Sequence, residues 1–202
     1  DIELVGAAAT LVTERFRQHN VIPSPTAATL LYAAIVSHTL NLRNRITTNR
    51  DQVCAAWLRE IAKPPAELIH DLFTAKSKAA ESSLANVIEH DYATRIYNGI
   101  SIGIAQLEII KAANLTTDRK VDILAALEKT KTKQGNDHAF LTALDVEELN
   151  NYFVTSDKFL QDLLSKIFNI TFNNSIAKVP GPYMRKELGP MFERLLTKAP
   201  PQ

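Results

Sequence analysis

Two places in the sequence bring together residue types that could take part in chemistry. The first is His38, followed by Thr39, at the polar end of the almost wholly apolar segment 26–37. A neutral imidazole can bind a metal or transfer a proton, and a histidine that ends a helix can also interact with the helix dipole or a backbone carbonyl. The residue itself therefore leaves two interpretations open: a helix-end residue, or a metal ligand or acid/base group facing a polar cleft.

The second place is the adjacent pair Arg185 and Lys186, just ahead of the predicted last helix. We expect the loop around this pair to be stiff, because it contains prolines and a glycine: Pro180, Gly181, Pro182 and Pro190. Arginine offers phosphate a planar fork of donors, and lysine offers a compact charge. Such a pair is also typical of a solvated face, so it indicates a phosphate-binding site only together with other features.

Common catalytic and cofactor motifs are missing from the sequence. One cysteine and five scattered histidines provide no zinc-binding spacing, and neither a glycine-rich phosphate loop nor Gly-x-Ser-x-Gly occurs. The 23 basic and 22 acidic residues nearly cancel to a net charge of +1, so no overall field attracts nucleic acid or a membrane surface. No apolar run of about 18 residues predicts a membrane span. We therefore expect neither nucleic acid nor a membrane as a partner.

Cys54 lies on an apolar stripe and, as the only cysteine, cannot form an internal disulfide. We interpret it as a core residue of a protein from a reducing compartment, and we expect a cytoplasmic location. No signal peptide is recognisable. The chain begins at Asp1 without an initiator methionine, which we interpret as a fragment or a processed product.

The first predicted part of the chain, residues 1–75, is helical. An apolar stripe at helical spacing predicts a first helix: Leu4, Ala8, Leu11, Val12 and Phe16. Ser24-Pro25 predicts the start of a second helix, and Thr48 with Asp51 resembles the capping box of a third. The second helix is apolar nearly all round, so we expect something absent from this chain to cover it.

The small polar residues of segment 74–82 predict a linker to a second part. Beyond it strands and helices alternate, which predicts an α/β domain. Asn98-Gly99 is a strong signal for a β-hairpin turn within residues 93–109. Further elements are predicted along the rest of the chain: a helix over 117–133, a strand over 138–146, a helix capped by Ser156, a short strand over 169–172, and a last helix.

Three segments carry a resemblance to a known family. Residues 5–16, VGAAATLVTERF, are similar to a V-G-S-x-x-T-L helix. Residues 33–51, AAIVSHTLNLRNRITTNRD, align without a gap with A-A-I-x-S-D-T-L-x-F-K-S-P-T-x-T-x-x-D. Residues 179–195, VPGPYMRKELGPMFERL, are similar to L-P-G-x-x-S-R-K-K-x-x-x-P-P-L. In this order they resemble the C-terminal two-thirds of the DHH phosphoesterase superfamily, in its branch of manganese-dependent inorganic pyrophosphatases and exopolyphosphatases.

The resemblance implies an α/β fold class, in which the helical end of an α/β DHH domain is followed by a smaller α/β domain with a mixed sheet. Residues 1–75 would be the C-terminal helices of a DHH-type domain whose N-terminal part is absent. Residues 76–202 would form the DHH-associated C-terminal substrate-binding domain. The active site of the family lies in the cleft between these domains.

The resemblance further implies that this chain is part of a metal-dependent phosphoanhydride hydrolase acting on pyrophosphate or short polyphosphate, and that it supplies the phosphate-gripping domain. Mn²⁺ or Mg²⁺ would be held mostly by residues absent from this chain, because the motifs H-x-x-x-D-x-D and D-H-H do not occur in it. Its expected partner is the missing N-terminal DHH half or a second copy in a homo-oligomer.

Four residues take family roles by this resemblance. Arg185 and Lys186 fall on the phosphate-gripping Arg-Lys pair. Lys78 is the best counterpart of a further phosphate-binding lysine, with Lys76 the next choice. His38 stands at the position of a metal-binding aspartate and is expected to be a metal ligand, although carboxylates suit hard ions better.

Departures from the family pattern leave other functions open. Besides His38, Met184 replaces a serine, and Glu187 replaces a third basic residue. These changes favour the alternative of a non-catalytic phosphate-binding or protein-interaction module with a degenerate metal site. An oligonucleotide- or cyclic-dinucleotide-cleaving relative ranks last, because the glycine-rich G-G-G-H stretch of such members is absent.

Overall fold

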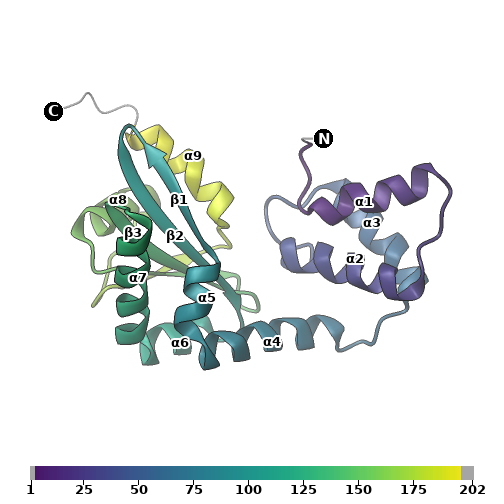
Figure 1. The fold of residues 1–202 in the computed structure, drawn as a ribbon, viewed down its shortest axis with the longest axis horizontal. Coiled ribbons are helices and arrows are strands. Elements are labelled where there is room, and N and C mark those ends of the chain that lie inside the picture. The colour runs from purple at the N-terminus through teal and green to yellow at the C-terminus, as the bar shows by residue number, and fades with distance from the viewer. Residues whose placement is uncertain (1–2, 197–202) are drawn as a thin grey trace. The chain divides into compact units, whose positions relative to one another are not determined.

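The computed structural model describes residues 3–196, which fold as two compact units divided between Ala75 and Lys76 (Figure 1). The predicted parts 1–75 and 76–202 include residues 1–2 and 197–202, which lie outside the described residues. Among the described residues, no helix combines the length and the apolar character that crossing a membrane requires.

The first unit is made of helices. They are α1 (Ala8–Gln18), α2 (Pro25–His38), α3 (Asn49–Ala62) and the beginning of α4 (Leu68–Ser82). Ser24 caps α2 by accepting a hydrogen bond from the backbone of Ala27 at 3.2 Å. Thr48 and Asp51 form a complete capping box at the start of α3. Both predicted helix starts are confirmed, because each depends on residues within one turn of one another.

The core of the first unit lies between α2 and α3. Its buried residues include Ile35, Cys54 and Leu58, so the interpretation of Cys54 as a core residue is confirmed. The expected apolar face of α1 is wrong in part. Val12 is 46% exposed, whereas Thr10 and Thr13 are fully buried. A buried hydrogen bond explains the difference. The Thr10 hydroxyl donates to the buried carboxylate of Asp51, so the face of α1 that carries Thr10 is directed inward.

The second unit contains a five-stranded sheet in the order β1-β2-β3-β4-β5. The strands are β1 (Tyr92–Tyr97), β2 (Ile100–Ile109), β3 (His138–Asp145), β4 (Asn150–Val154) and β5 (Ile176–Pro180). β2 and β3 pair in parallel and the other neighbours are antiparallel, which confirms the predicted mixed-sheet α/β fold class. At the β1–β2 turn, Asn98 and Gly99 have φ of 49° and 84°, as a type I′ turn requires.

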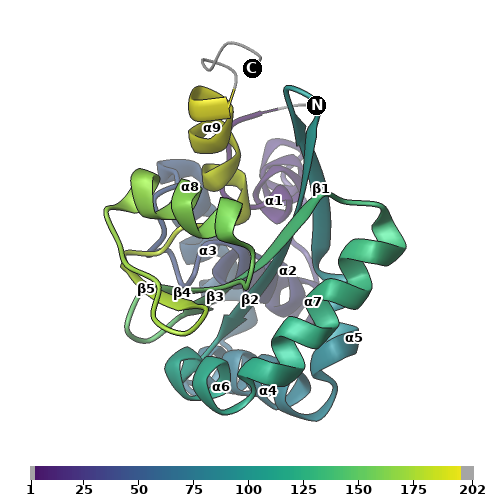
Figure 2. The same ribbon diagram turned by 90° about the vertical axis from the view of Figure 1, so that its left-hand side faces the viewer.

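Helices cover both faces of this sheet (Figures 1 and 2). The helices are α5 (Leu84–His90), α6 (Ala112–Asp118), α7 (Lys120–Gln134), α8 (Lys158–Phe168) and α9 (Arg185–Leu196). Successive strand residues alternate between two cores: Ala105 packs in the core with α5 and α7, and Ile104 in the core with α8 and α9. This alternation is the period of two that a strand buried on both sides requires.

Three local predictions for the second part are wrong. Segment 74–82 is not a linker but the end of α4, where Ala80 is completely buried. Asp157, not Ser156, caps α8, and its side chain accepts from the backbone of Leu160. Segment 169–172 is not a strand; the edge strand is β5, because its backbone pairs with β4.

Candidate functional site

His38 is the last residue of α2, and its side chain is exposed. The chain then makes a left-handed turn: Leu40, Asn41 and Leu42 have φ of 51°, 56° and 61°. Outside glycine such conformations are uncommon and cost roughly 1–2 kcal/mol per residue. Residues 38–44 are named the His38 turn below. Backbone strain of this kind gathers at functional sites, so its place beside His38 supports a functional interpretation.

Hydrogen bonds hold the His38 turn in its unusual conformation. The hydroxyl of Thr39 donates to the carbonyl of Ile35 at 2.6 Å and accepts from the backbone of Leu42 at 3.1 Å. The side-chain amide of Asn44 donates to the carbonyl of His38 at 3.0 Å. The Asn44 bond uses the backbone of His38, and the His38 side chain is exposed, which is compatible with either interpretation of the residue.

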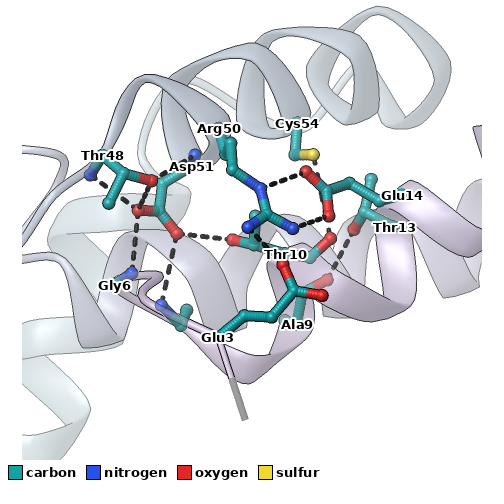
Figure 3. A network of polar contacts seen from close by, with 11 residues as sticks. Glu3, Gly6, Ala9, Thr10, Thr13, Glu14, Thr48, Arg50, Asp51 and Cys54 are labelled. Carbon is teal, nitrogen blue, oxygen red and sulfur yellow. Dashed lines mark hydrogen bonds and ion pairs between the residues drawn. The ribbon is translucent and has the colours of Figure 1, made fainter. Parts of the chain in front are cut away.

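A network of polar contacts surrounds Asp51 at the start of α3 (Figure 3). The fully buried carboxylate of Asp51 accepts from the backbone of Gly6 at 2.8 Å, from the hydroxyl of Thr10 at 2.6 Å, and from the backbone and hydroxyl of Thr48, both at 2.7 Å. Burial opposes ionisation of Asp51, but these hydrogen bonds outweigh it and lower its pKa. A carboxylate so fully engaged is structural.

Gly6 joins this network to the His38 turn through close contact. A Cβ at this position would stand 2.7 Å from Cγ2 of Thr39 and 2.9 Å from Oδ2 of Asp51. Only glycine therefore fits between the turn and the carboxylate. Beside it, the guanidinium of Arg50 donates from Nε to Glu14 at 2.7 Å and pairs with Glu3 at 2.5 Å, and its hydrogen bond lowers the pKa of Glu14 (Figure 3).

Arg185 begins α9 in the second unit, and the side chain is only partly exposed, at 24%. Its guanidinium Nη1 donates to the backbone carbonyls of Asp91 at 2.8 Å and Ile104 at 3.2 Å. Nη2 forms an ion pair with the Asp91 carboxylate at 2.8 Å. Arg185 is thus fixed by groups that lie between 81 and 94 residues away in sequence.

Gln106, buried in β2, connects Arg185 to a second cation. Its Oε1 accepts from the backbone N–H of Arg185 at 2.6 Å, and its Nε2 donates to Glu108 at 2.9 Å. Glu108 in turn pairs with Lys76 on α4 at 2.6 Å. Arg185, Asp91, Gln106, Glu108 and Lys76 are named the Arg185 network below.

The structure separates the predicted phosphate-binding residues into two groups. Arg185 belongs to the network, and the exposed Lys186 follows it on α9. Lys76 also belongs to the network, whereas Lys78 is exposed two residues further along α4 and has no contact to Arg185 among the described residues. Lys76, the second choice from the sequence, thus lies in the Arg185 network and Lys78 does not, and the phosphate-binding role of either lysine stays a prediction.

Met184 and Glu187 show how the departures from the family pattern are accommodated. Met184 is buried, with its sulfur 4.0 Å from Nε2 of Gln106. The carboxylate of Glu187 accepts from the backbone of Met184 at 2.9 Å at the start of α9, where a helix favours negative charge. Pro190 lies inside α9, so the expectation that it stiffens the preceding loop is wrong.

Sequence reasoning missed Asp91, Gln106 and Glu108. Asp91 looks like an ordinary polar residue after a helix, and Glu108 like a charge near a strand end. Gln106 offered the one available signal, since a glutamine within an apolar strand must find hydrogen-bond partners when it is buried. The identity of those partners depends on how strands and helices pack.

Residues 70–195 match the model of a protein family described as the DHHA2 domain. Over 188 residues the chain is 28% identical to the "Probable manganese-dependent inorganic pyrophosphatase" of Clostridium acetobutylicum, covering 92% of this chain and 59% of that protein. It is 26% identical over 200 residues to the manganese-dependent inorganic pyrophosphatase of Methanothrix thermoacetophila, covering 97% of this chain and 64% of that protein. The chain thus spans about three-fifths of the length of these relatives.

The fold is similar to that in the crystal structure of a candidate family II inorganic pyrophosphatase from Methanococcus jannaschii. The TM-score is 0.83 at 25% sequence identity, and the likeness covers 96% of this chain and 66% of that one. The similarity therefore extends through both units of the chain.

Proposed function

The chain belongs to the DHHA2 domain family, and from this premise we propose that it supplies the phosphate-binding domain of a manganese-dependent inorganic pyrophosphatase. Its substrate would be pyrophosphate, with short polyphosphate as a possible exopolyphosphatase-type substrate. Pyrophosphatase relatives that align with more than nine-tenths of the chain support this proposal.

The observation that carries the proposal is the fixed position of Arg185 beside Lys186 at the start of α9. Arg185 is held through its backbone by Gln106 and through its guanidinium by Asp91 and Ile104. A preorganised guanidinium loses little freedom when it binds phosphate. In the proposed function Arg185 provides a directed donor pair, and Lys186 and Lys76 add charge. Lys78 stays a weaker candidate for the same role.

Manganese would need ligands besides those of this chain. Within residues 3–196 no group of three or more histidine, cysteine, aspartate or glutamate side chains is placed to hold a metal ion. We propose that His38 contributes one ligand to a metal held mostly by other residues. When bound, such a metal would activate a water molecule for attack on phosphorus.

The remaining parts of the proposal concern partners and location. A DHH-type N-terminal half, or a second copy of the protein, would complete the site. The single buried cysteine, which has no disulfide partner, supports a cytoplasmic location.

The proposal is tested by measuring phosphate release from pyrophosphate in the presence of Mn²⁺, with the whole protein that the gene encodes. Arg185→Ala should lower kcat/KM about ten- to a hundredfold, because a charge-assisted hydrogen bond contributes about 1.5–3 kcal/mol. Arg194→Ala, an exposed arginine at the other end of α9, is the matched control and should behave as wild type. Equal kinetics for the two variants would contradict the proposed role of Arg185.

A non-catalytic phosphate-binding module is the second candidate. The observation in its favour is charge: Asp91, Glu108 and Glu187 are three carboxylates among the cations of this region. A protein that binds pyrophosphate with loss of affinity in Arg185→Ala, but releases no phosphate with any divalent metal, would support this module. The presence of H-x-x-x-D-x-D and D-H-H in the sequence encoded ahead of Asp1 would instead favour the enzyme.

A further inference from the structure

The ion pair between Arg185 and Asp91 needs an explanation. A residue proposed to bind phosphate is already paired with a carboxylate, at 2.8 Å, and the Asp91 side chain remains 45% exposed. Asp91 could act in two ways. It could compete with phosphate for the guanidinium, or it could hold the guanidinium in the orientation that phosphate needs.

The hydrogen bonds of Arg185 distinguish these two roles. A guanidinium has five N–H donors. Nη1 donates to the carbonyls of Asp91 and Ile104, and Nη2 forms an ion pair with the Asp91 carboxylate. The Nε–H makes no hydrogen bond to another described residue. Nε and Nη2 lie along one edge of the guanidinium, the arrangement that binds two oxygens of one phosphate.

Asp91 is itself anchored where it meets Arg185. Its backbone carbonyl accepts from the backbone N–H of Gln106 at 3.1 Å as well as from the guanidinium. The side chain of Gln106 binds the backbone N–H of Arg185 at 2.6 Å. Both members of the ion pair are thus attached to the same residue of β2, so their relative position is set by the sheet.

We propose that Asp91 is a positioning residue for phosphate binding. Its carboxylate and carbonyl occupy one edge of the Arg185 guanidinium and so direct the other edge, Nε and Nη2, toward the phosphate. This inference rests on the proposed function and deepens it, because it specifies which edge of the arginine binds the ligand. A competing carboxylate would instead have to leave before phosphate could bind.

The direction in which Asp91→Asn changes the Kd for pyrophosphate separates the two roles. Asp91→Asn keeps the size of the side chain and removes its charge. If Asp91 positions Arg185, the Kd for pyrophosphate measured by calorimetry should rise about three- to tenfold, and the same change in an Arg185→Ala background should have no effect. If Asp91 competes with phosphate, the Kd should fall, which overturns the proposal. Asp122→Asn, which removes the ion pair between Asp122 on α7 and Arg119 just before that helix, is the matched control.

A second measurement does not depend on binding. The ¹⁵N relaxation of the Arg185 Nε–H reports the order of the guanidinium directly. Positioning predicts an ordered signal in the wild type and in Asp122→Asn, and a mobile one in Asp91→Asn. An unchanged signal in Asp91→Asn overturns the positioning role. Failure of the proposed function would look different: equal pyrophosphate binding by the wild type and Arg185→Ala.

Discussion

The His38 turn and the Arg185 network hold their central residues by different means. His38 is fixed through its backbone, because Asn44 binds its carbonyl and the strained residues 40–42 follow it, while its side chain is exposed. Arg185 is fixed through its side chain as well, because its guanidinium makes two hydrogen bonds and one ion pair to other parts of the unit. When a residue is held through its backbone, its side chain can be substituted at little cost in stability. Position 38 is such a residue, and there the sequence has histidine in place of the aspartate of the family pattern.

The largest effect should come from removing the support of the His38 turn. Asp51→Ala should lower the free energy of unfolding by about 3–5 kcal/mol, because several buried donors lose a charged acceptor. Chemical denaturation at pH 7 measures it. Glu60→Ala, an exposed acid on the same helix α3, should change stability by less than about 0.5 kcal/mol.

The pH dependence of the same variant gives an independent check. The pKa of Asp51 is lowered in the folded state, so the contribution of its charge is complete above the unfolded pKa of about 3.9 and is lost as pH falls through the folded pKa. The wild type should therefore lose stability more steeply than Asp51→Ala as the pH falls below about 4. Parallel curves for the two proteins would mean that Asp51 has no lowered pKa.

A smaller loss should follow from Gly6→Ala, because the new Cβ would overlap Thr39 in the His38 turn and the carboxylate of Asp51. We expect a cost of about 1–3 kcal/mol in thermal or chemical unfolding. Gly189→Ala is the contrasting control in α9, where the new Cβ would meet only the Tyr97 hydroxyl at an ordinary 3.5 Å. That variant should be neutral or slightly stabilising, since alanine is the better helix former.

Arg185→Lys tests the side-chain half of the comparison. Lysine keeps the charge but cannot bind both carbonyls and the carboxylate of Asp91 together, so we expect a loss of about 1–2 kcal/mol in the stability of the second unit. Arg194→Lys provides the matched control on the same helix. Unfolding curves that do not differ between the two variants would show that the guanidinium contacts of Arg185 contribute nothing to stability.

The smallest effect is expected at His38. His38→Asp should change the free energy of unfolding by less than about 0.5 kcal/mol, because the side chain is exposed and the hydrogen bond of Asn44 uses the backbone. A metal-ligand role would appear in Mn²⁺ dependence, which the substitution should alter when activity or metal affinity is titrated in the protein as encoded. A large loss of stability would instead mean that the imidazole supports the fold.

Short-range features of this protein could be predicted from its sequence. The caps at Ser24 and Thr48 and the hairpin turn at Asn98-Gly99 each depend on residues no more than a few positions apart. The alternation of strands and helices after a set of helices predicted the α/β fold class, which is confirmed. The mixed sheet is confirmed too, but that expectation came from the family resemblance and not from local pattern. The places of Arg185 and His38 at helix ends also follow from local pattern.

Long-range packing decided the rest. The spacing of apolar residues predicts that α1 has a buried face, but the hydrogen bond from Thr10 to Asp51 decides which face is buried. The polar composition of residues 74–82 suggested a linker, yet burial of Ala80 makes the segment helical. Asp91, Gln106 and Arg185 meet only because β2 and the start of α9 pack together. Such contacts join residues about 80 to 95 positions apart, and no local pattern specifies which distant group will satisfy a buried donor or charge.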